Sequence, residues 1–453
     1  MIQRVLIANR SEIAVRIIRA CKEMGIETVA VYSQADKEAL HVQMADQAVC
    51  IGASLASESY LNMNNLIQAA CLTGCDAIHP GFGFLSENSR FARLVQECGL
   101  TWIGPRPEVI EQLGNKTEAR KMMAAKGVPI IPGMSKALSS EQEGLSVADE
   151  IGYPIILKAS NGGGGKGMRV VRSETEFQDA YYQTKSEAKQ FFGDEDVYIE
   201  KFIENPKHIE VQLAGDRYGN CVHFYERDCS FQIDNQKMME EAPCSCLSEA
   251  QRAALVESAC KACKAAKYDS VGTVEFLFDG NQHYFMEMNT RIQVEHPITE
   301  MITGIDLIAL QIRLAQGDPL PFTQAQIHKN GVAIECRINA EDMHHDFHGC
   351  AGKIRFYHCP GGNGIRVDSG IYSGYEVPPF YDSMLCKIIA YAPNRKACIQ
   401  KMKGALEEII VDGIETNEEF LYLALFQEDF LKGSYDTSMA AKFYQQCKKE
   451  ELL

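Results

Sequence analysis

The sequence lacks the long apolar run that a membrane helix needs. No stretch approaches the ~18 consecutive apolar residues that cross a bilayer, and residues 1–10 lack the charged and apolar regions of a signal peptide. Basic residues are also scarce, because 45 lysines and arginines face 61 acidic residues, for a net charge of −16. This balance argues against a nucleic-acid or anionic-membrane surface, since both need a basic excess. We therefore expect a cytoplasmic protein with no nucleic-acid partner and no membrane.

A cysteine framework for metal binding is missing too, although the chain has 17 cysteines. Cys260 and Cys263 form a C-x-x-C pair, but no second pair stands at zinc spacing. The pair lies in a helical, Ala- and Lys-rich stretch, which favours packing over a redox or zinc site. We interpret Cys71/Cys75 and Cys244/Cys246 in the same way, as small hydrophobic side chains in a reducing compartment.

No G-x-G-x-x-G motif follows the first predicted strand, so a dinucleotide site is not expected there. Strand and helix patterns nevertheless alternate over the first ~110 residues. Apolar runs predict strands at 5–8, 28–32, 76–78 and 101–103, and helical spacing predicts helices at 12–24 and 61–71. This alternation indicates a β/α domain with a parallel sheet.

Further along, the patterns predict a helix over 116–126 and strands over 153–158 and 168–172. A proline-rich stretch near 127–133 indicates a change of domain, and a half-buried strand over 331–340 opens a C-terminal region. A helix over 396–409 and a helical tail follow. No internal repeat or low-complexity linker separates these regions.

The most informative stretch is residues 285–297, Phe-Met-Glu-Met-Asn-Thr-Arg-Ile-Gln-Val-Glu-His-Pro. Its polar residues alternate, and in one extended strand they would share a face: Glu287, Asn289, Arg291, Gln293 and Glu295. A buried structural strand avoids such a row, because desolvated charges are costly unless paired. We therefore expect a functional edge here, with an ordinary solvated strand face as the alternative.

A glycine-rich segment, Asn161-Gly-Gly-Gly-Gly-Lys-Gly167, lies between two predicted strands. Consecutive glycines can present backbone N–H groups to an anion, and Lys158 and Lys166 add positive charge. The segment lacks the Lys-Ser/Thr of a P-loop, and a strand follows it instead of a helix. It therefore predicts a mobile hairpin loop that folds over phosphates, with a plain flexible loop as the alternative.

Glu275 and Glu287 belong to a second predicted hairpin, whose turn is Asp279-Gly-Asn-Gln282 and whose returning strand is 283–289. Two carboxylates and the Asn289 amide oxygen facing one space would suit Mg²⁺, a hard ion that often shares its site with phosphate oxygens. A two-residue turn would place Glu275 opposite Met286, on the wrong face. We therefore predict an odd-length loop or a bulge that brings Glu275 and Glu287 together.

Three cations, Lys237, Arg291 and Arg337, are far apart in the sequence, so only the fold can unite them. Taken singly, each would be a surface charge or part of a structural ion pair.

At this point the chain resembles the ATP-grasp superfamily, because it combines a glycine-rich hairpin loop, a preceding lysine, two acidic metal ligands and an asparagine. The run 286–297 is more narrowly similar to biotin carboxylase. Other segments agree with that resemblance, which covers nearly the whole chain to about Leu431: residues 8–16, 79–88, 227–230 and 237–243.

The resemblance implies a fold of mixed α/β and α+β class with three parts. These would be an N-terminal parallel β/α domain over 1–114, an ATP-grasp domain over 115–330 and a C-terminal mixed domain over 331–446. The ATP-grasp domain would include a mobile glycine-rich lid over about 131–203, and a tail over 447–453 would close the chain.

The resemblance also assigns site residues by matching position. ATP would be held by Lys116, Lys158, Gly163, Gly164, Gly165, Lys166, Glu200, Lys201, Ile203, His208, Gln232, Asn235 and Leu277, and Mg²⁺ or Mn²⁺ by Glu275, Glu287 and Asn289. Bicarbonate and biotin would meet Lys237, Arg291, Gln293, Val294, Glu295, Arg337 and Phe82. Of these, Glu295 would be the general base, Arg291 and Lys237 would stabilise the anion, and Arg337 would face the biotin ureido oxygen.

Three departures from the family pattern stand out: Ser11 in place of Gly, Phe82 in place of Tyr, and Ile233-Asp234-Asn235 in place of Arg-Arg-His. The last removes positive charge near the expected nucleotide.

No Met-Lys-Met biotin-attachment site occurs in the sequence, and we expect no carboxyltransferase region in this chain. The resemblance therefore implies a homodimeric biotin carboxylase subunit of acetyl-CoA carboxylase, working with a biotin carboxyl carrier protein and carboxyltransferase subunits. A component of another acyl-CoA or pyruvate carboxylase, another ATP-grasp ligase and a regulatory nucleotide-binding module remain alternatives.

Overall fold

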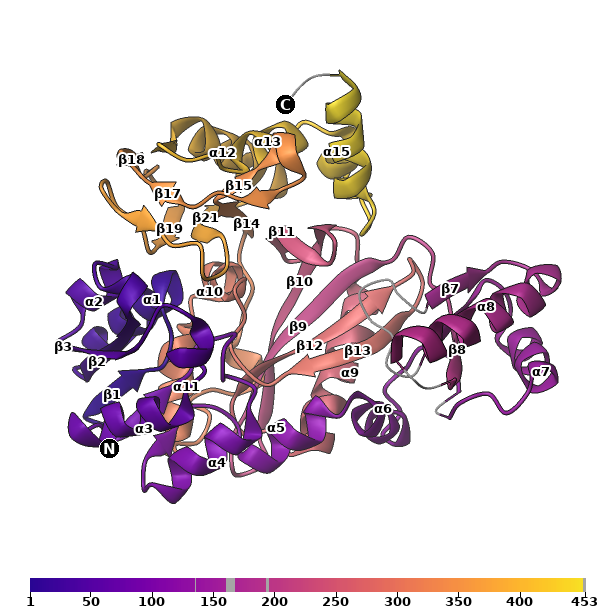
Figure 1. The fold of residues 1–453 in the computed structure, drawn as a ribbon, viewed down its shortest axis with the longest axis horizontal. Coiled ribbons are helices and arrows are strands. Elements are labelled where there is room, and N and C mark those ends of the chain that lie inside the picture. The colour runs from indigo at the N-terminus through magenta and orange to yellow at the C-terminus, as the bar shows by residue number, and fades with distance from the viewer. Residues whose placement is uncertain (135, 160–167, 193–194, 451–453) are drawn as a thin grey trace.

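The computed structural model describes residues 1–134, 136–159, 168–192 and 195–450. Within these ranges, a five-stranded, an eight-stranded and a three-stranded sheet lie in separate regions of the molecule (Figure 1). No helix in the described part of the chain is both long and apolar enough to cross a bilayer.

The N-terminal region is built on a five-stranded parallel sheet in the order β3-β2-β1-β4-β5. Its elements are β1 (Arg4–Ile7), α1 (Ser11–Glu23), β2 (Glu27–Ser33), α2 (Leu40–Met44), β3 (Gln47–Gly52), α3 (Met63–Leu72), β4 (Ala77–His79), α4 (Ser89–Glu97), β5 (Thr101–Trp102) and α5 (Pro107–Gly114). The predicted parallel β/α arrangement is confirmed. Strand β3 is not among the predicted elements. It is an edge strand with a short apolar run over 48–51, but Ile51 is its single buried residue.

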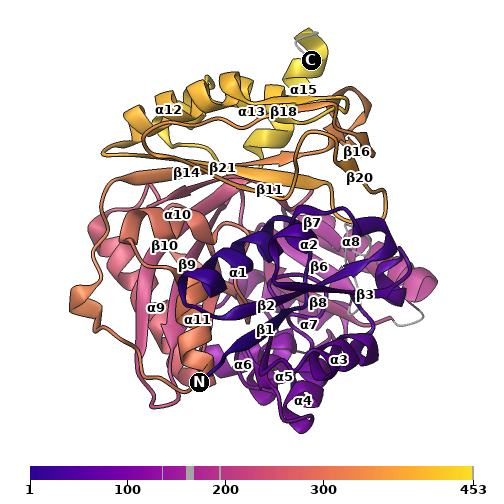
Figure 2. The same cartoon turned by 90° about the vertical axis from the view of Figure 1, so that its left-hand side faces the viewer.

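The central and C-terminal regions share one eight-stranded antiparallel sheet, in the order β13-β12-β9-β10-β11-β14-β21-β19. Its strands are β9 (Lys207–Gly215), β10 (Cys221–Ile233), β11 (Gln236–Ala242), β12 (Val271–Phe278), β13 (His283–Asn289), β14 (Val332–Asn339), β19 (Ile365–Ser369) and β21 (Met384–Ala392). Helix α9 (Glu249–Ala266) packs on β9 and β10, and α12 (Arg395–Glu408) packs on β14 and β21 at the top of Figure 2. The pairing of β11 with β14 makes the sheet continuous between the two regions.

A small three-stranded sheet, β7-β6-β8, lies apart from the rest, at the right of Figure 1. Its strands are β6 (Ile155–Ala159), β7 (Met168–Val171) and β8 (Val197–Lys201), and α7 (Glu141–Ile151) and α8 (Glu174–Phe192) pack on it. The strands predicted on either side of the glycine-rich segment are therefore confirmed. The predicted phosphate loop itself, with Gly163, Gly164, Gly165 and Lys166, lies outside the described residues.

The remaining helices and short strands connect and cover these sheets. They are α6 (Lys116–Ala125), α10 (His296–Thr303), α11 (Leu307–Ala315), α13 (Glu418–Ala424), α14 (Glu428–Lys432), α15 (Met439–Glu450), β15 (Glu341–Asp342), β16 (His348–Gly349), β17 (Gly352–Lys353), β18 (Phe356–His358), β20 (Glu376–Val377) and β22 (Ile410–Asp412). The predicted helices over 116–126 and 396–409 correspond to α6 and α12, and the predicted helical tail to α15.

The packed interpretation of the cysteine pairs is only partly right. Cys263 is buried in α9, as predicted, and Cys75 and Cys244 are buried as well. Cys71 and Cys246, however, are exposed, and Cys246 lies in the loop between β11 and α9. For these two thiols the packed interpretation is wrong, because an isolated helical or loop pattern does not show which side faces solvent.

Candidate active site

A cavity of about 1160 Å³, called the central cavity below, lies where the N-terminal region, the eight-stranded sheet and the C-terminal region meet. Many of the residues predicted from the sequence line it: Phe82, Lys116, His208, Gln232, Asn235, Lys237, Glu275, Leu277, Glu287, Asn289, Arg291, Gln293, Val294, Glu295 and Arg337. Segments far apart in the chain therefore bring their polar side chains to one cavity. Among them are the three cations that are separated in the sequence, Lys237, Arg291 and Arg337.

The β12–β13 hairpin has the predicted bulge. Phe276 pairs with Phe285, but Glu275 pairs with Glu287, so Met286 is one extra residue on β13. A bulge shifts the alternation of side chains by one position. Phe285 can therefore point into the apolar core while Glu287 lies beside Glu275 at the cavity.

The expectation of one extended face through Glu295 is wrong. Strand β13 ends at Asn289, and Glu295 is the N-cap residue of α10. Gln293 explains the turn, because its Nε2 donates to Glu275 Oε1 at 2.7 Å. A continued strand would carry Gln293 about 13 Å beyond Asn289, out of reach of Glu275.

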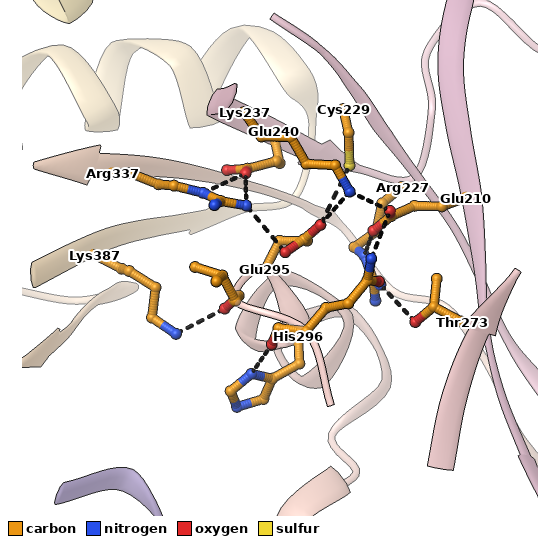
Figure 3. A network of polar contacts seen from close by, with 12 residues as sticks. Glu210, Arg227, Cys229, Lys237, Glu240, Thr273, Glu295, His296, Arg337 and Lys387 are labelled. Atoms are coloured by element: carbon orange, nitrogen blue, oxygen red, sulfur yellow. Dashed lines mark hydrogen bonds and ion pairs between the residues drawn. The ribbon is translucent and has the colours of Figure 1, made fainter. Parts of the chain in front are cut away.

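Glu295, which lines the central cavity, contacts two cations (Figure 3). Its Oε1 lies 2.7 Å from Lys237 Nζ, and its Oε2 lies 3.0 Å from an Arg337 guanidinium nitrogen. Glu295 is 2% exposed, so little water screens these pairs. Two of the three predicted cations thus meet at one carboxylate, while Arg291 Nε donates to Glu87 Oε2 at 2.9 Å.

Behind Glu295 lies a buried layer that the sequence analysis did not assign. Arg227 is fully buried, and it donates to Glu210 Oε1 at 2.5 Å and to Gln293 Oε1 at 2.6 Å. Glu210 Oε2 in turn accepts from Lys237 Nζ at 2.7 Å (Figure 3). Arg227 stands in a segment that carries the family resemblance, but only the pairing of β9 with β10 shows what it contacts.

The cations decide the protonation of the carboxylates at this site. Burial alone would raise the pKa of Glu295, but the Lys237 ammonium and the Arg337 guanidinium hold that pKa well below its usual range. Burial opposes ionisation of Glu275 too, and Lys237 and His208 nevertheless lower its pKa well below normal. Glu240 behaves differently: burial raises its pKa to about 7, even though Arg337 Nε donates to it at 2.7 Å.

The residues predicted to hold a metal form a compact oxygen-rich group. Glu275 and Glu287 are cross-strand neighbours, and Asn289 Nδ2 donates to Glu275 Oε1 at 2.8 Å. Glu287 Oε2 lies 2.8 Å from the ammonium of Lys116, whose side chain is 77% exposed. Carboxylate and amide oxygens suit a hard divalent cation such as Mg²⁺. The donor set therefore fits the expected ion.

Four further residues predicted to contact ATP, Lys158, Glu200, Lys201 and Ile203, lie on the small sheet or just after it. Lys158 Nζ donates to Glu200 Oε2 at 2.5 Å, and Arg120 pairs with the other Glu200 oxygen. Lys201 Nζ donates to the backbone carbonyls of Gly152 and Tyr153 instead, at 2.9 and 3.0 Å. Ile203 follows β8 and is largely buried. None of these four predicted residues is among the described residues that line the central cavity.

Three family models match successive parts of the chain. Residues 1–110 match the model described as biotin carboxylase, N-terminal domain, and residues 335–442 match the biotin carboxylase C-terminal domain. Residues 115–323 match the ATP-binding domain of the carbamoyl-phosphate synthase L chain. Together the matches span all three regions of the fold.

Individual proteins are similar over nearly the whole chain. Biotin carboxylase 1 of Bacillus subtilis is 52% identical over 439 residues, covering 96% of this chain and 98% of that protein. The crystal structure of the Campylobacter jejuni biotin carboxylase–β,γ-ATP complex is 46% identical, with a TM-score of 0.90 and coverage of 98% and 99%. The biotin carboxylase domain dimer of Hydrogenobacter thermophilus 2-oxoglutarate carboxylase, with MgADP, ADP and bicarbonate, is 46% identical, with a TM-score of 0.88 and coverage of 99% and 98%.

Proposed function

The chain belongs to the biotin carboxylase family, and we propose that it carboxylates biotin with ATP and bicarbonate. The observation that carries this proposal is Glu295 held between Lys237 and Arg337 beside the Glu275–Glu287 pair. An ionised carboxylate next to two cations can bind and deprotonate a small oxyanion, while neighbouring oxygen ligands serve a nucleotide's metal ion.

The first step would be activation of bicarbonate. Glu295 accepts the bicarbonate proton, and Lys237 and Arg291 stabilise the resulting anion, whose oxygen attacks the γ-phosphorus of ATP. ADP leaves, and carboxyphosphate forms. Mg²⁺ held by Glu275, Glu287 and Asn289 would neutralise charge on the phosphate oxygens.

Glu295 is a weak base while both cations hold it, because its pKa lies well below normal. A bound bicarbonate anion would compete with Glu295 for the ammonium of Lys237. That competition raises the proton affinity of Glu295 at the moment when it has to accept a proton.

The second step would transfer the carboxyl group. Carboxyphosphate breaks into CO₂ and phosphate, the phosphate takes the proton from biotin N1′, and that nitrogen attacks CO₂. Arg337 stabilises the negative charge on the ureido oxygen. Glu240 and Glu295 hold the guanidinium of Arg337 in place from two sides, at 2.7 and 3.0 Å, so that it is oriented before biotin arrives (Figure 3).

We further infer that residues 1–114, 115–330 and 331–446 act as the three domains expected for the family, and that the protein is a cytoplasmic homodimer. A dimer among the similar structures and the near-complete coverage of a separate bacterial biotin carboxylase support this inference. The partners would be a biotin carboxyl carrier protein and the carboxyltransferase subunits of acetyl-CoA carboxylase. The second candidate is a carboxylase whose final carboxyl acceptor is not acetyl-CoA, because one of the similar structures comes from 2-oxoglutarate carboxylase.

The test is ATP hydrolysis by the purified protein, measured with and without bicarbonate and free biotin. We expect hydrolysis to require bicarbonate and to rise with biotin. Glu295→Gln should abolish the bicarbonate-dependent rate but leave ATP binding intact, while Glu97→Gln on the exposed end of α4 should change neither. An ATP hydrolysis rate that does not depend on bicarbonate, or normal turnover by Glu295→Gln, would contradict the proposal.

A further inference from the structure

Two thiols lie side by side outside the central cavity. Cys244 and Cys246 stand in the loop between β11 and α9, and their sulfur atoms are 3.3 Å apart. Cys244 is 1% exposed, whereas Cys246 is exposed to solvent. The sulfur of Cys246 can therefore react with a solute, and the sulfur of Cys244 is buried next to it.

Two charged side chains next to the pair, Asp228 and Lys207, affect the protonation of its thiols. The Sγ of Cys244 lies 3.5 Å from Asp228 Oδ2, and Lys207 Nζ donates to the same oxygen at 2.7 Å. Cys244 carries a single S–H proton, which either Asp228 or a Cys246 thiolate can accept. When the Cys244 proton points to Cys246, Asp228 loses that hydrogen bond but keeps its ion pair with Lys207. Cys244 can therefore donate to a thiolate at Cys246 without leaving Asp228 unpaired.

The acidity of the two thiols follows from this arrangement. The hydrogen bond from Cys244 lowers the pKa of Cys246, and the Lys207 ammonium lowers it further. Burial raises the pKa of Cys244 well above its usual value. An exposed thiolate with a protonated thiol beside it is the pattern of an oxidation-sensitive cysteine and its resolving partner.

We propose that Cys244 and Cys246 form a peroxide-sensitive dithiol that closes to a reversible disulfide. The Cys246 thiolate attacks one oxygen of hydrogen peroxide, the O–O bond breaks, and the released hydroxide takes a proton to become water. The Cys244 sulfur then attacks the Cys246 sulfenic acid, the S–O bond breaks, and a second water leaves with the Cys244 proton. Two thiols are oxidised, one peroxide is reduced, and a small-molecule dithiol can reverse the step.

The geometry favours a disulfide over a metal ion at the same place. The sulfur atoms need to approach from 3.3 Å to about 2.0 Å, which is a small movement for side chains in a loop. A zinc ion would need Asp228 as its third ligand, but Lys207 occupies that carboxylate and would repel a cation.

The experiment treats the purified full-length protein with hydrogen peroxide, alkylates it under denaturing conditions and counts free thiols by peptide mass spectrometry. We expect two of the 17 thiols to disappear, joined as a Cys244–Cys246 disulfide, and to return after dithiothreitol treatment. In Cys246→Ser, peroxide should not reduce the number of free thiols. In Cys244→Ser, peroxide should leave a sulfenic acid at Cys246 that dimedone traps. Cys98→Ser, which removes an exposed thiol at the end of α4, should behave like the wild type.

Two results would overturn the proposal: alkylation of Cys244 and Cys246 that peroxide does not change, or a zinc ion that copurifies and protects both thiols. The readout does not use biotin or ATP, so its failure is distinct from a failure of the proposed function.

Discussion

The ammonium of Lys387 donates to the backbone carbonyl of Val294 at 2.7 Å, although the two residues come from different regions of the chain (Figure 3). Lys387 is fully buried on β21, and its Nζ also lies 3.2 Å from Glu12 Oε2 on α1. One buried cation thus ties the N-terminal and C-terminal regions to the residue that precedes Glu295.

Replacing Lys387 by Met should damage both stability and activity. Glu12 would remain buried without its cation, a change that costs about 3–5 kcal/mol in free energy of unfolding. The carbonyl of Val294 would also lose its donor, so the Michaelis constant for bicarbonate should rise. Chemical denaturation and steady-state kinetics measure the two effects.

The double variant Lys387→Met with Glu12→Gln separates these effects. It should recover much of the stability, since the Glu12 charge is removed together with its cation, but it should keep the raised Michaelis constant. Full recovery of both quantities would contradict a positioning role for Lys387.

Arg227→Lys should lower kcat/KM for bicarbonate by about tenfold or more, because lysine cannot reproduce the planar, multiply donating guanidinium that holds Glu210 and Gln293. Binding of ATP should change little. Arg252→Lys is the matched control, because Arg252 is also buried and pairs with Glu226 at 2.7 Å, but it lies on α9. Equal losses in the two variants would show a general packing defect instead.

The raised pKa of Glu240 predicts a pH dependence of stability. Its folded-state pKa of about 7 exceeds the usual glutamate value of 4.5, so its contribution to stability is fully present below pH 4.5 and is lost as the pH rises through about 7. The free energy of unfolding of the wild type, relative to Glu240→Gln, should therefore fall between these pH values. Urea denaturation at a series of pH values measures the difference, and parallel curves for the two proteins would refute the assignment.

Glu287→Gln should raise the Mg²⁺ concentration needed for half-maximal activity by about tenfold, because one carboxylate ligand of a weakly held hard ion is lost. Lys116 would be released from its ion pair at the same time. Glu118→Gln, on the same helix as Lys116, should leave the Mg²⁺ curve unchanged. An unchanged curve for Glu287→Gln would place the metal elsewhere.

The sequence predicts local features of the site well where they depend on alternation. The strand from His283 to Asn289 and the need for a bulge opposite Glu275 both follow from the two-residue repeat of a strand. The turn after Asn289 does not follow from it, because the turn depends on contacts of Gln293 with Arg227 and Glu275 across the sheet. Those contacts exist only once the strands have paired.

Residues that act from behind the site were missed for the same reason. Glu210 and Glu240 sit on strands whose pattern alone gives no sign that they face Lys237 and Arg337. Lys387 likewise lies in an ordinary apolar strand of the C-terminal region. Resemblance to a family located the cavity-lining residues, but the partners that orient them required the three-dimensional register.

The continuous sheet sets a limit on how the protein can be divided. Cutting the chain after residue 330 would separate β11 from β14 and leave the backbone groups of Met239 to Ala242 without their partners. An open strand edge of this kind is a template for pairing with other chains, so the shortened protein should aggregate. The shortened protein would also lack Arg337 and Lys387. The pairing of β11 with β14 therefore holds together both the fold and the part of the central cavity that contains Glu295.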